Sequence, residues 1–226
     1  MRQGLALGKL RTVYGRVAKR YDRQHSLTTA GTDQRGRELL VQSAVEAGDR
    51  VLDCGAGTGS TGILAARRVG PNGHVTMFDL SEKMLDIARG KIAGERLQER
   101  ATFATGDMVQ LPFADGQFDV VLSTYSLCPL YDPARGALEL LRVTKPGGRL
   151  GIAHSVEPAN RLVRWLGDLI ESVAWRLPAL SMGCRAVRVL PVLERAGCRV
   201  VLQKRIGVPL WPFIVFVVEK PPSSLV

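Results

Sequence analysis

The run of residues Val51–Gly59 constrains the fold more than any other stretch of the chain. It reads Val-Leu-Asp-Cys-Gly-Ala-Gly-Thr-Gly, a short apolar segment that ends in an acid and continues with glycine at every second position. Ser60 and Thr61 are residue types that cap helices, and an apolar run with Ile63 and Leu64 follows them. Glycine permits a tight turn and lets a ligand touch bare backbone, while N–H groups at the start of a helix point towards that ligand. The pattern therefore predicts a strand, a nucleotide-binding loop and a helix.

The glycine positions alone leave two classes of nucleotide open. A dinucleotide-binding loop follows its strand with Gly-x-Gly-x-x-Gly, and counting from Gly55 puts Ser60 in the third place. Counting from Gly57 satisfies that pattern but starts the turn late, so a dehydrogenase stays an alternative. Asp53 lies two residues before the first glycine and suits a zwitterion whose ammonium group needs a carboxylate. In this respect Asp-x-Gly-x-Gly-x-Gly resembles the first motif of class I S-adenosylmethionine (SAM) methyltransferases.

Acidic residues also end the next two predicted strands. A strand over residues 74–78 runs into Asp79, about twenty residues past the glycine loop, which is the spacing expected of a ribose-binding acid. A strand over residues 101–105 is followed by one glycine and then Asp107. Ligands of such folds bind at the carboxyl ends of the strands, so both acids are expected beside Asp53. A dehydrogenase does not need the third acid, although each later acid also has a plainer reading as a turn residue.

Further motifs follow in order and make the resemblance specific. They are Phe118-Asp119-Val120-Val121, the segment Arg142-Val143-Thr144-Lys145-Pro146-Gly147-Gly148, and the earlier Val17-Ala18-Lys19-Arg20-Tyr21-Asp22. Together with the glycine loop they resemble class I SAM methyltransferases over residues 10 to 155. The most similar branch contains ubiquinone/menaquinone-biosynthesis C-methyltransferases and bacterial phospholipid N-methyltransferases. The resemblance implies an α/β, Rossmann-like fold: a seven-stranded, mostly parallel sheet with helices on both faces, an antiparallel last strand and an N-terminal helical lid.

The resemblance also implies SAM as the cofactor, S-adenosylhomocysteine as its product, and a set of binding residues. Asp53 and the loop amides would hold the methionine end, Asp79 the ribose, and Asp107 the adenine amino group. The expected cofactor-binding residues are Tyr21, Asp53, Gly55, Gly57, Gly59, Asp79, Leu80, Met84, Gly106, Asp107, Met108 and Ser123. No metal is expected, because the four cysteines form no Cys-x-x-Cys pair and read as reduced thiols.

The chemistry of methyl transfer needs positioning first, because SAM already carries a good leaving group. An acceptor that must lose a proton would also need a nearby base. The candidates are His154, at the end of a strand predicted over residues 150–154, and Tyr125, just after a strand predicted over residues 118–123. The plainer reading of His154 is a histidine packed in the core.

Two regions outside the shared motifs carry the information on the acceptor. Residues 1–47 are expected to form the lid and first helices, and residues 48–226 the SAM-binding domain with a substrate-cap segment at about 156–198. A helix over residues 9–21 has an apolar face and a basic face. With a net charge of +10, this basic face could meet an anionic membrane or simply be solvated. All three tryptophans follow residue 160, where core packing competes with an acceptor pocket.

These features predict a cytoplasmic methyltransferase for a small lipophilic acceptor, such as a quinone precursor or phospholipid head group, with peripheral membrane contact left open. Short resemblances at residues 126–128 and 182–185 keep a small-molecule thiol methyltransferase as an alternative. A nucleic-acid methyltransferase is less favoured, because Ser123-Thr124-Tyr125-Ser126 lacks the prolines that amino-directed enzymes carry there. A non-catalytic SAM-binding protein is the remaining alternative, and the sequence does not indicate an oligomeric state.

Overall fold

The computed structural model describes residues 7–18, 31–158, 160, 163, 165, 186–209 and 211–222, with the side chain of Trp211 outside the description. Its helices are α1 (Leu7–Val17), α3 (Thr32–Ala44), α4 (Ser60–Arg68), α5 (Glu82–Gly94), the 3-10 helix η2 (Gln98–Arg100), α6 (Pro133–Val143) and α9 (Leu190–Arg195). Its strands are β1 (Arg50–Cys54), β2 (His74–Asp79), β3 (Ala101–Thr105), β4 (Phe118–Thr124), β5 (Thr144–Ser155), β6 (Arg199–Val208) and β7 (Trp211–Glu219).

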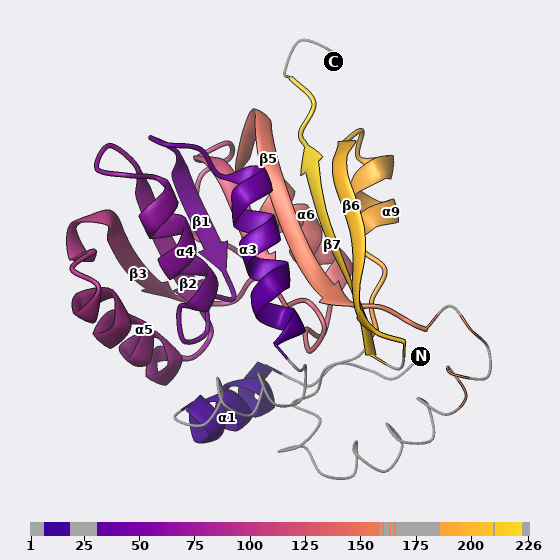
Figure 1. The fold of residues 1–226 in the computed structure, drawn as a ribbon, viewed down its shortest axis with the longest axis horizontal. Coiled ribbons are helices and arrows are strands. Elements are labelled where there is room, and N and C mark those ends of the chain that lie inside the picture. Colours follow the sequence, from indigo (N-terminus) through magenta and orange to yellow (C-terminus); the bar gives the residue numbers. More distant parts are fainter. Residues whose placement is uncertain are drawn as a thin grey trace.

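The strands form one seven-stranded sheet in the order β3-β2-β1-β4-β5-β7-β6 (Figure 1). The first five strands in this order pair in parallel, while β7 pairs antiparallel with both β5 and β6. The chain winds outward from β1 to β3 and then returns to place β4 on the other side of β1. This reversal creates the crevice in which doubly wound folds bind ligands. The predicted Rossmann-like sheet with an antiparallel last strand is confirmed.

Two apolar layers bury the faces of the sheet (Figure 1). Helices α3, α4 and α5 cover one face, to which they contribute Leu40, Val41, Ala65, Ala66, Leu85 and Ala88. Helices α6 and α9 cover the other face, to which they contribute Ala137, Leu140, Leu141 and Leu193. The inner strands are buried on both sides, as expected for parallel strands between helical layers.

The helix caps differ from the prediction at two places. Gly59, with a φ of 85°, occupies the N-cap of α4, and no side chain caps that helix. Ser60 and Thr61 are therefore inside the helix, so their predicted capping role is wrong. The sequence also predicts Asp33 as the cap of a helix that runs to about Ala47, but Gly31, with a φ of 73°, occupies the N-cap of α3, and Asp33 lies in the first helical turn. A capping side chain becomes unnecessary where glycine lets the backbone itself turn sharply into the helix.

The sequence Asp132-Pro133 predicts an N-cap followed by a helix that starts at the proline, and the start of α6 confirms it. Asp132 accepts a hydrogen bond from the Arg135 amide at 3.0 Å, and Pro133 occupies the first turn, where its missing N–H has no cost. Strand β5 instead begins at Thr144, earlier than the predicted residue 150, because Thr144 pairs with Phe118 before an irregularity in the ladder. The apolar spacing of residues 160–177 predicts a further helix, and this segment lies largely outside the described residues.

Candidate active site

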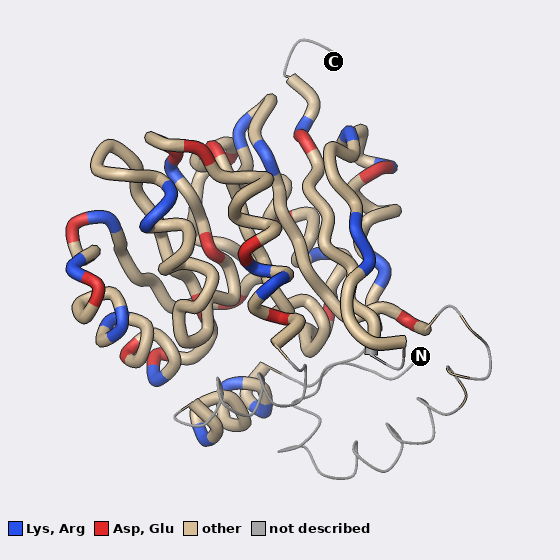
Figure 2. The backbone as a smooth tube through the Cα atoms, viewed as in Figure 1, with Lys and Arg blue, Asp and Glu red and all other residues tan. Residues whose placement is uncertain are grey.

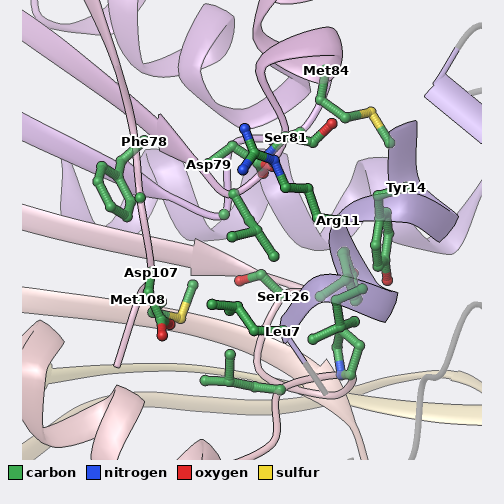
Figure 3. Close-up of a pocket in the computed structure, with 18 of the residues that line it drawn as sticks. Leu7, Arg11, Tyr14, Phe78, Asp79, Ser81, Met84, Asp107, Met108 and Ser126 are labelled. Atoms are coloured by element: carbon green, nitrogen blue, oxygen red, sulfur yellow. The ribbon is translucent and has the colours of Figure 1, made fainter. Parts of the chain in front are cut away.

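A pocket opens at the carboxyl ends of the parallel strands, where α1 covers it (Figure 3). Residues from the loops after β1, β2, β3 and β4 line it, together with Leu7, Leu10, Arg11 and Tyr14 of α1. Arg11 extends from α1 towards the loop that carries Asp79 and Ser81 (Figure 3). The pocket thus lies at the topological switch point, beneath the helix predicted to act as a lid.

The pocket brings together nine of the predicted site residues: Gly55, Gly57, Asp79, Leu80, Met84, Gly106, Asp107, Met108 and Tyr125. The predicted residues Asp53, Gly59, Ser123 and His154 are not among those that line it. Tyr21 lies outside the described residues.

The three loop glycines are required for different physical reasons. A Cβ atom on Gly55 would lie 2.2 Å from the Cβ of Ser126, so only glycine lets these two loops approach. Gly57 has open space around it, but its φ of 55° is one that other residues rarely adopt. A Cβ atom on Gly59 would lie 2.9 Å from the Cβ of Ala88, so this glycine allows α4 to pack closely against α5. Gly55 and Gly57 thus shape the pocket wall, while Gly59 contributes indirectly through the packing of α4 against α5.

Asp79 combines both roles that the sequence left open. One carboxylate oxygen accepts the Gly57 amide at 2.8 Å, and the other accepts the Ser81 amide at 2.8 Å. The carboxylate therefore holds the glycine loop against the start of α5 while it also lines the pocket. Burial raises the pKa of Asp79, and the two amides oppose that rise. Since each ionised oxygen can accept a further bond, Asp79 can still receive the hydroxyls of a ribose.

Asp107 is held in a similar way from two sides. Its Oδ1 accepts the Val109 amide at 3.0 Å, and its Oδ2 accepts the hydroxyl of Tyr131 at 2.7 Å. The apolar side chains of Leu80 and Met108 line the same pocket, as expected for residues on either side of a planar base. Tyr131 lies in the loop between β4 and α6 and is absent from the predicted site.

Asp53 lies at the end of β1, directly before the glycine loop, with no exposed surface. Neither of its carboxylate oxygens makes a hydrogen bond of good geometry among the described residues, although the backbone amide of Gly62 is close enough to favour the ionised form. Burial raises the pKa of Asp53 to about 7, with the charge of Arg37 acting against that rise. A buried carboxylate without a partner is costly, and a cationic group close to it would remove that cost. This orphaned acid fits a ligand that carries an ammonium group, as SAM does.

Arg37, a buried cation that the motifs did not predict, lies behind the pocket. Its Nη1 donates to the hydroxyls of Thr61 and Thr124 at 2.9 and 2.8 Å, and its Nε lies 3.8 Å from a carboxylate oxygen of Asp33. Thr124 lines the pocket, so Arg37 connects α3 to the pocket wall. A signal was present in the sequence, because positions 33, 37, 40, 41 and 44 share one helical face and the first two are charged.

Tyr125 has a backbone rarely adopted by a tyrosine. Its φ is 58°, its side chain is buried, and its hydroxyl donates to the backbone oxygen of Asp33 at 3.3 Å. Burial raises the pKa of Tyr125, so the phenol stays protonated. Such left-handed residues cost free energy and persist where the surrounding structure fixes them, as at ligand sites.

His154 and Ser123 lie deeper than the pocket. The Nδ1 of His154 is 2.9 Å from the backbone oxygen of Ser155, its ring packs edge-on against Phe216, and burial lowers its pKa. The hydroxyl of Ser123 is 2.6 Å from that of Ser126, and Ser126 lines the pocket. Ser123 thus affects the pocket only through its contact with Ser126, while His154 has the surroundings of a core histidine.

Helix α1, the predicted lid, carries basic residues and no acidic ones. Lys9, Arg11 and Arg16 are exposed, and Figure 2 shows their positive charges along the helix. Leu10 is buried against the domain. None of the helices within the described residues is long and apolar enough to cross a membrane.

Comparisons with known proteins assign the middle of the chain to a family. Residues 51–148 match the family described as "Methyltransferase domain". The demethylmenaquinone methyltransferase of Lactobacillus johnsonii is 37% identical over 153 residues, which cover 67% of this chain and 63% of that protein. The ubiquinone/menaquinone biosynthesis C-methyltransferase of Pseudomonas putida is 33% identical over 156 residues, which cover 69% of this chain and 61% of that protein. The chain thus spans less than two thirds of the length of these relatives.

Solved structures share the fold at low sequence identity. A SAM-dependent methyltransferase from Aquifex aeolicus superposes with a TM-score of 0.60 at 22% identity and covers 87% of this chain and 97% of its own. The [4+2]-cyclase SpnF superposes with a TM-score of 0.68 at 21% identity and covers 84% of this chain and 82% of its own. A cyclase and a methyltransferase can therefore share this architecture, and the reaction has to be argued from the site.

Proposed function

We infer the function from the premise that this chain belongs to the class I SAM-dependent methyltransferases, as its motifs predicted. We propose that it transfers a methyl group from SAM to a small lipophilic acceptor of the quinone-precursor type. The observation that carries the proposal is the set of acids at adjacent strand ends. Asp79 and Asp107 line one pocket, and the orphaned carboxylate of Asp53 lies at the end of the strand between β2 and β4.

Each acid has a proposed role towards SAM. Asp53, with the amides of the glycine loop, balances the charge of the methionine ammonium. Asp79 accepts hydrogen bonds from the ribose hydroxyls through the lone pairs that Gly57 and Ser81 leave available. Asp107 receives the adenine amino group, with Leu80 and Met108 against the ring. Met84, Gly106 and Ser123 complete the proposed set, and Tyr21 stays a prediction from the sequence.

The apolar part of the pocket supports a lipophilic acceptor. Leu7 and Leu10 come from the lid, while Pro129 and Leu130 come from the loop after β4. These side chains offer an acceptor apolar contact and few hydrogen bonds, which suits an aromatic or prenylated ring better than a nucleic acid. Two relatives named for menaquinone or ubiquinone biosynthesis support the same choice.

The proposed reaction needs alignment more than acid–base chemistry. The acceptor atom forms a bond to the methyl carbon as the bond from that carbon to the sulfonium breaks, and the sulfur leaves as a neutral thioether. Holding the two reactants in line supplies much of the acceleration. A carbon acceptor then loses a proton, and the ionisable groups predicted for this step are Tyr125 and His154. Tyr125 lines the pocket, but its protonated phenol donates to the backbone oxygen of Asp33, so we assign this residue to holding the pocket wall against which the acceptor packs.

Two assays test the proposal in sequence. Calorimetry with SAM, S-adenosylhomocysteine and NAD should show binding of the first two and none of NAD. Transfer from methyl-labelled SAM should then be measured into a demethylated quinol, a phospholipid, a small thiol and RNA. Label in the quinol supports the proposal, and label in a thiol or RNA would replace it with one of the alternatives. SAM binding without any transfer would favour a non-catalytic SAM-binding protein.

We also propose that the exposed basic side of α1 contacts an anionic membrane, where a lipophilic acceptor would be concentrated. Lys9 and Arg16 support this, because basic residues near such a surface contribute about 1 kcal/mol each. Co-sedimentation with vesicles should require anionic lipid and decrease with salt. Binding to purely zwitterionic vesicles at the same level would contradict an electrostatic contact.

A further inference from the structure

Tyr131 belongs to none of the sequence motifs, yet its side chain contacts Asp107, a predicted site residue. Its hydroxyl donates to the Oδ2 atom of Asp107 at 2.7 Å, across 24 residues of sequence. The ring is 42% exposed and is not among the residues that line the pocket. Its neighbours Pro129 and Leu130 do line the pocket, and Asp132 caps α6 directly after it. The hydrogen bond therefore joins two loops on the side of the pocket that is assigned to the adenine ring of SAM.

We propose that Tyr131 is a positioning residue that orients the Asp107 carboxylate, so that the site selects a nucleotide with an exocyclic amino group. The inference rests on the proposed function, in which Asp107 receives the adenine amino group of SAM.

The geometry supports orientation because both carboxylate oxygens have separate anchors. The Val109 amide holds Oδ1 at 3.0 Å from within the same loop, while Tyr131 holds Oδ2 from the loop after β4. The terminal torsion of an aspartate is otherwise broad, so one anchor alone leaves the carboxylate free to tilt. An ionised carboxylate has about four acceptor positions, which leaves two for a ligand. A carboxylate fixed before binding costs less to order when the ligand arrives.

Tyr131 can act only as a donor in this contact. The hydrogen bond to Asp107 raises the pKa of Tyr131 to about 12, so the phenol carries its proton at neutral pH. A hydrogen bond from a hydroxyl to a carboxylate is charge-assisted and short, which agrees with the observed distance. An oriented, ionised carboxylate attracts an amino group and repels a carbonyl oxygen at the same place. Asp107 held in this way would distinguish adenine from hypoxanthine.

The experiment compares two ligands that differ only at that position. S-adenosylhomocysteine carries the amino group, and S-inosylhomocysteine carries a carbonyl oxygen in its place. Calorimetry on the full chain should give wild-type protein a clear preference for S-adenosylhomocysteine. Tyr131→Phe should weaken S-adenosylhomocysteine binding about three- to tenfold and leave S-inosylhomocysteine nearly unchanged; the loss is smaller than that of a whole charge-assisted hydrogen bond, because Tyr131 acts through Asp107 and does not touch the ligand. In an Asp107→Ala background, Tyr131→Phe should have no further effect on the preference.

Controls separate positioning from a structural role. Leu138→Ala, on the exposed side of α6, should leave both affinities unchanged. If Tyr131→Phe weakened both ligands equally, or lowered the melting temperature, Tyr131 would merely tether the loop and the inference would be wrong. Tighter binding of S-adenosylhomocysteine by Tyr131→Phe would also overturn it, because the hydroxyl would then compete with adenine. Wild-type protein that bound neither ligand would contradict the proposed function itself.

Discussion

The guanidinium of Arg37 lies over the ring of Tyr125, with 5.0 Å between its central carbon and the ring centroid. The contact joins the helix before the glycine loop to the residue that follows β4 in the pocket wall. The hydroxyl of the same tyrosine donates to the backbone of Asp33, one helical turn before Arg37. Helix α3 therefore takes part in shaping the pocket, although none of its residues lines it.

Arg37→Met should destabilise the protein and weaken SAM binding. The substitution keeps an unbranched apolar stem but removes a buried cation, which leaves the carboxylates of Asp33 and Asp53 without the nearby positive charge of Arg37. Breaking a buried ionic cluster in this way costs about 3 kcal/mol. Urea denaturation measures this cost, and Arg35→Met on the exposed side of the same helix provides the control. Equal stability of the two variants would show that Arg37 does not hold the cluster together.

The ionisation of Asp53 should make the stability of the ligand-free protein depend on pH. Burial raises the pKa of Asp53 to about 7, whereas an aspartate in the unfolded chain has a pKa of about 4. Below about pH 4 the protonated carboxyl therefore makes its whole contribution to the free energy of unfolding. That contribution is lost as the pH rises through 7. Asp53→Asn removes the dependence, so relative to wild type this variant should gain about 2 kcal/mol between pH 5 and pH 8. Burial also raises the pKa of Asp79, and that residue is unchanged in both proteins. Parallel stability curves for wild type and variant would contradict the raised pKa of Asp53.

Asp79→Ala should lower the affinity for SAM by about 10- to 100-fold, because it removes the hydrogen bonds of a charged group to the ribose. It also releases the amides of Gly57 and Ser81, so the melting temperature should be recorded beside the calorimetric affinity. Asp86→Ala is the matched control, since Asp86 lies on the exposed side of neighbouring α5 and pairs with Arg89. Unchanged SAM affinity in Asp79→Ala would remove the ribose assignment.

Tyr125→Phe should lower kcat by no more than about threefold and leave the affinity for SAM nearly unchanged, because its hydroxyl donates to the backbone of Asp33 and holds the pocket wall rather than the acceptor. His154→Gln should keep kcat within about twofold, since His154 does not line the pocket. Steady-state transfer to the quinol and calorimetry with SAM give the two quantities separately. A large loss of kcat in His154→Gln, with stability and SAM affinity preserved, would restore that histidine as the base.

The sequence predicted the parts of the fold that depend on local pattern. The strand at Ala101–Thr105 and the cap at Asp132 matched to the residue, because the glycine that follows the strand and a cap followed by proline are local signals. The helix caps at Gly31 and Gly59 were missed, since a positive φ at glycine leaves no side-chain signature. The early start of β5 was missed because its Lys145–Arg149 segment has the composition of a turn yet lies within a strand.

The candidate site likewise contains some residues that the sequence predicted and others that it did not. The acids Asp79 and Asp107 could be placed from strand ends and spacing, and both reached the pocket. The partners of Arg37 and Tyr131 could not be predicted, since Thr124 and Asp107 are 87 and 24 residues away in the chain. Contacts of this kind depend on how two elements pack in three dimensions, which a local pattern does not encode.

Strand β7 lies between β5 and β6, although the chain reaches it last of the seven. While the chain is being synthesised, β5 has no partner on that side until residues 211–219 leave the ribosome. Its exposed edge would include Ile152 and Ala153, which are buried in the finished sheet. Unpaired apolar edges invite association with other chains. The protein is thus expected to be most prone to aggregation just before synthesis of the sheet is complete, when chaperones would matter most.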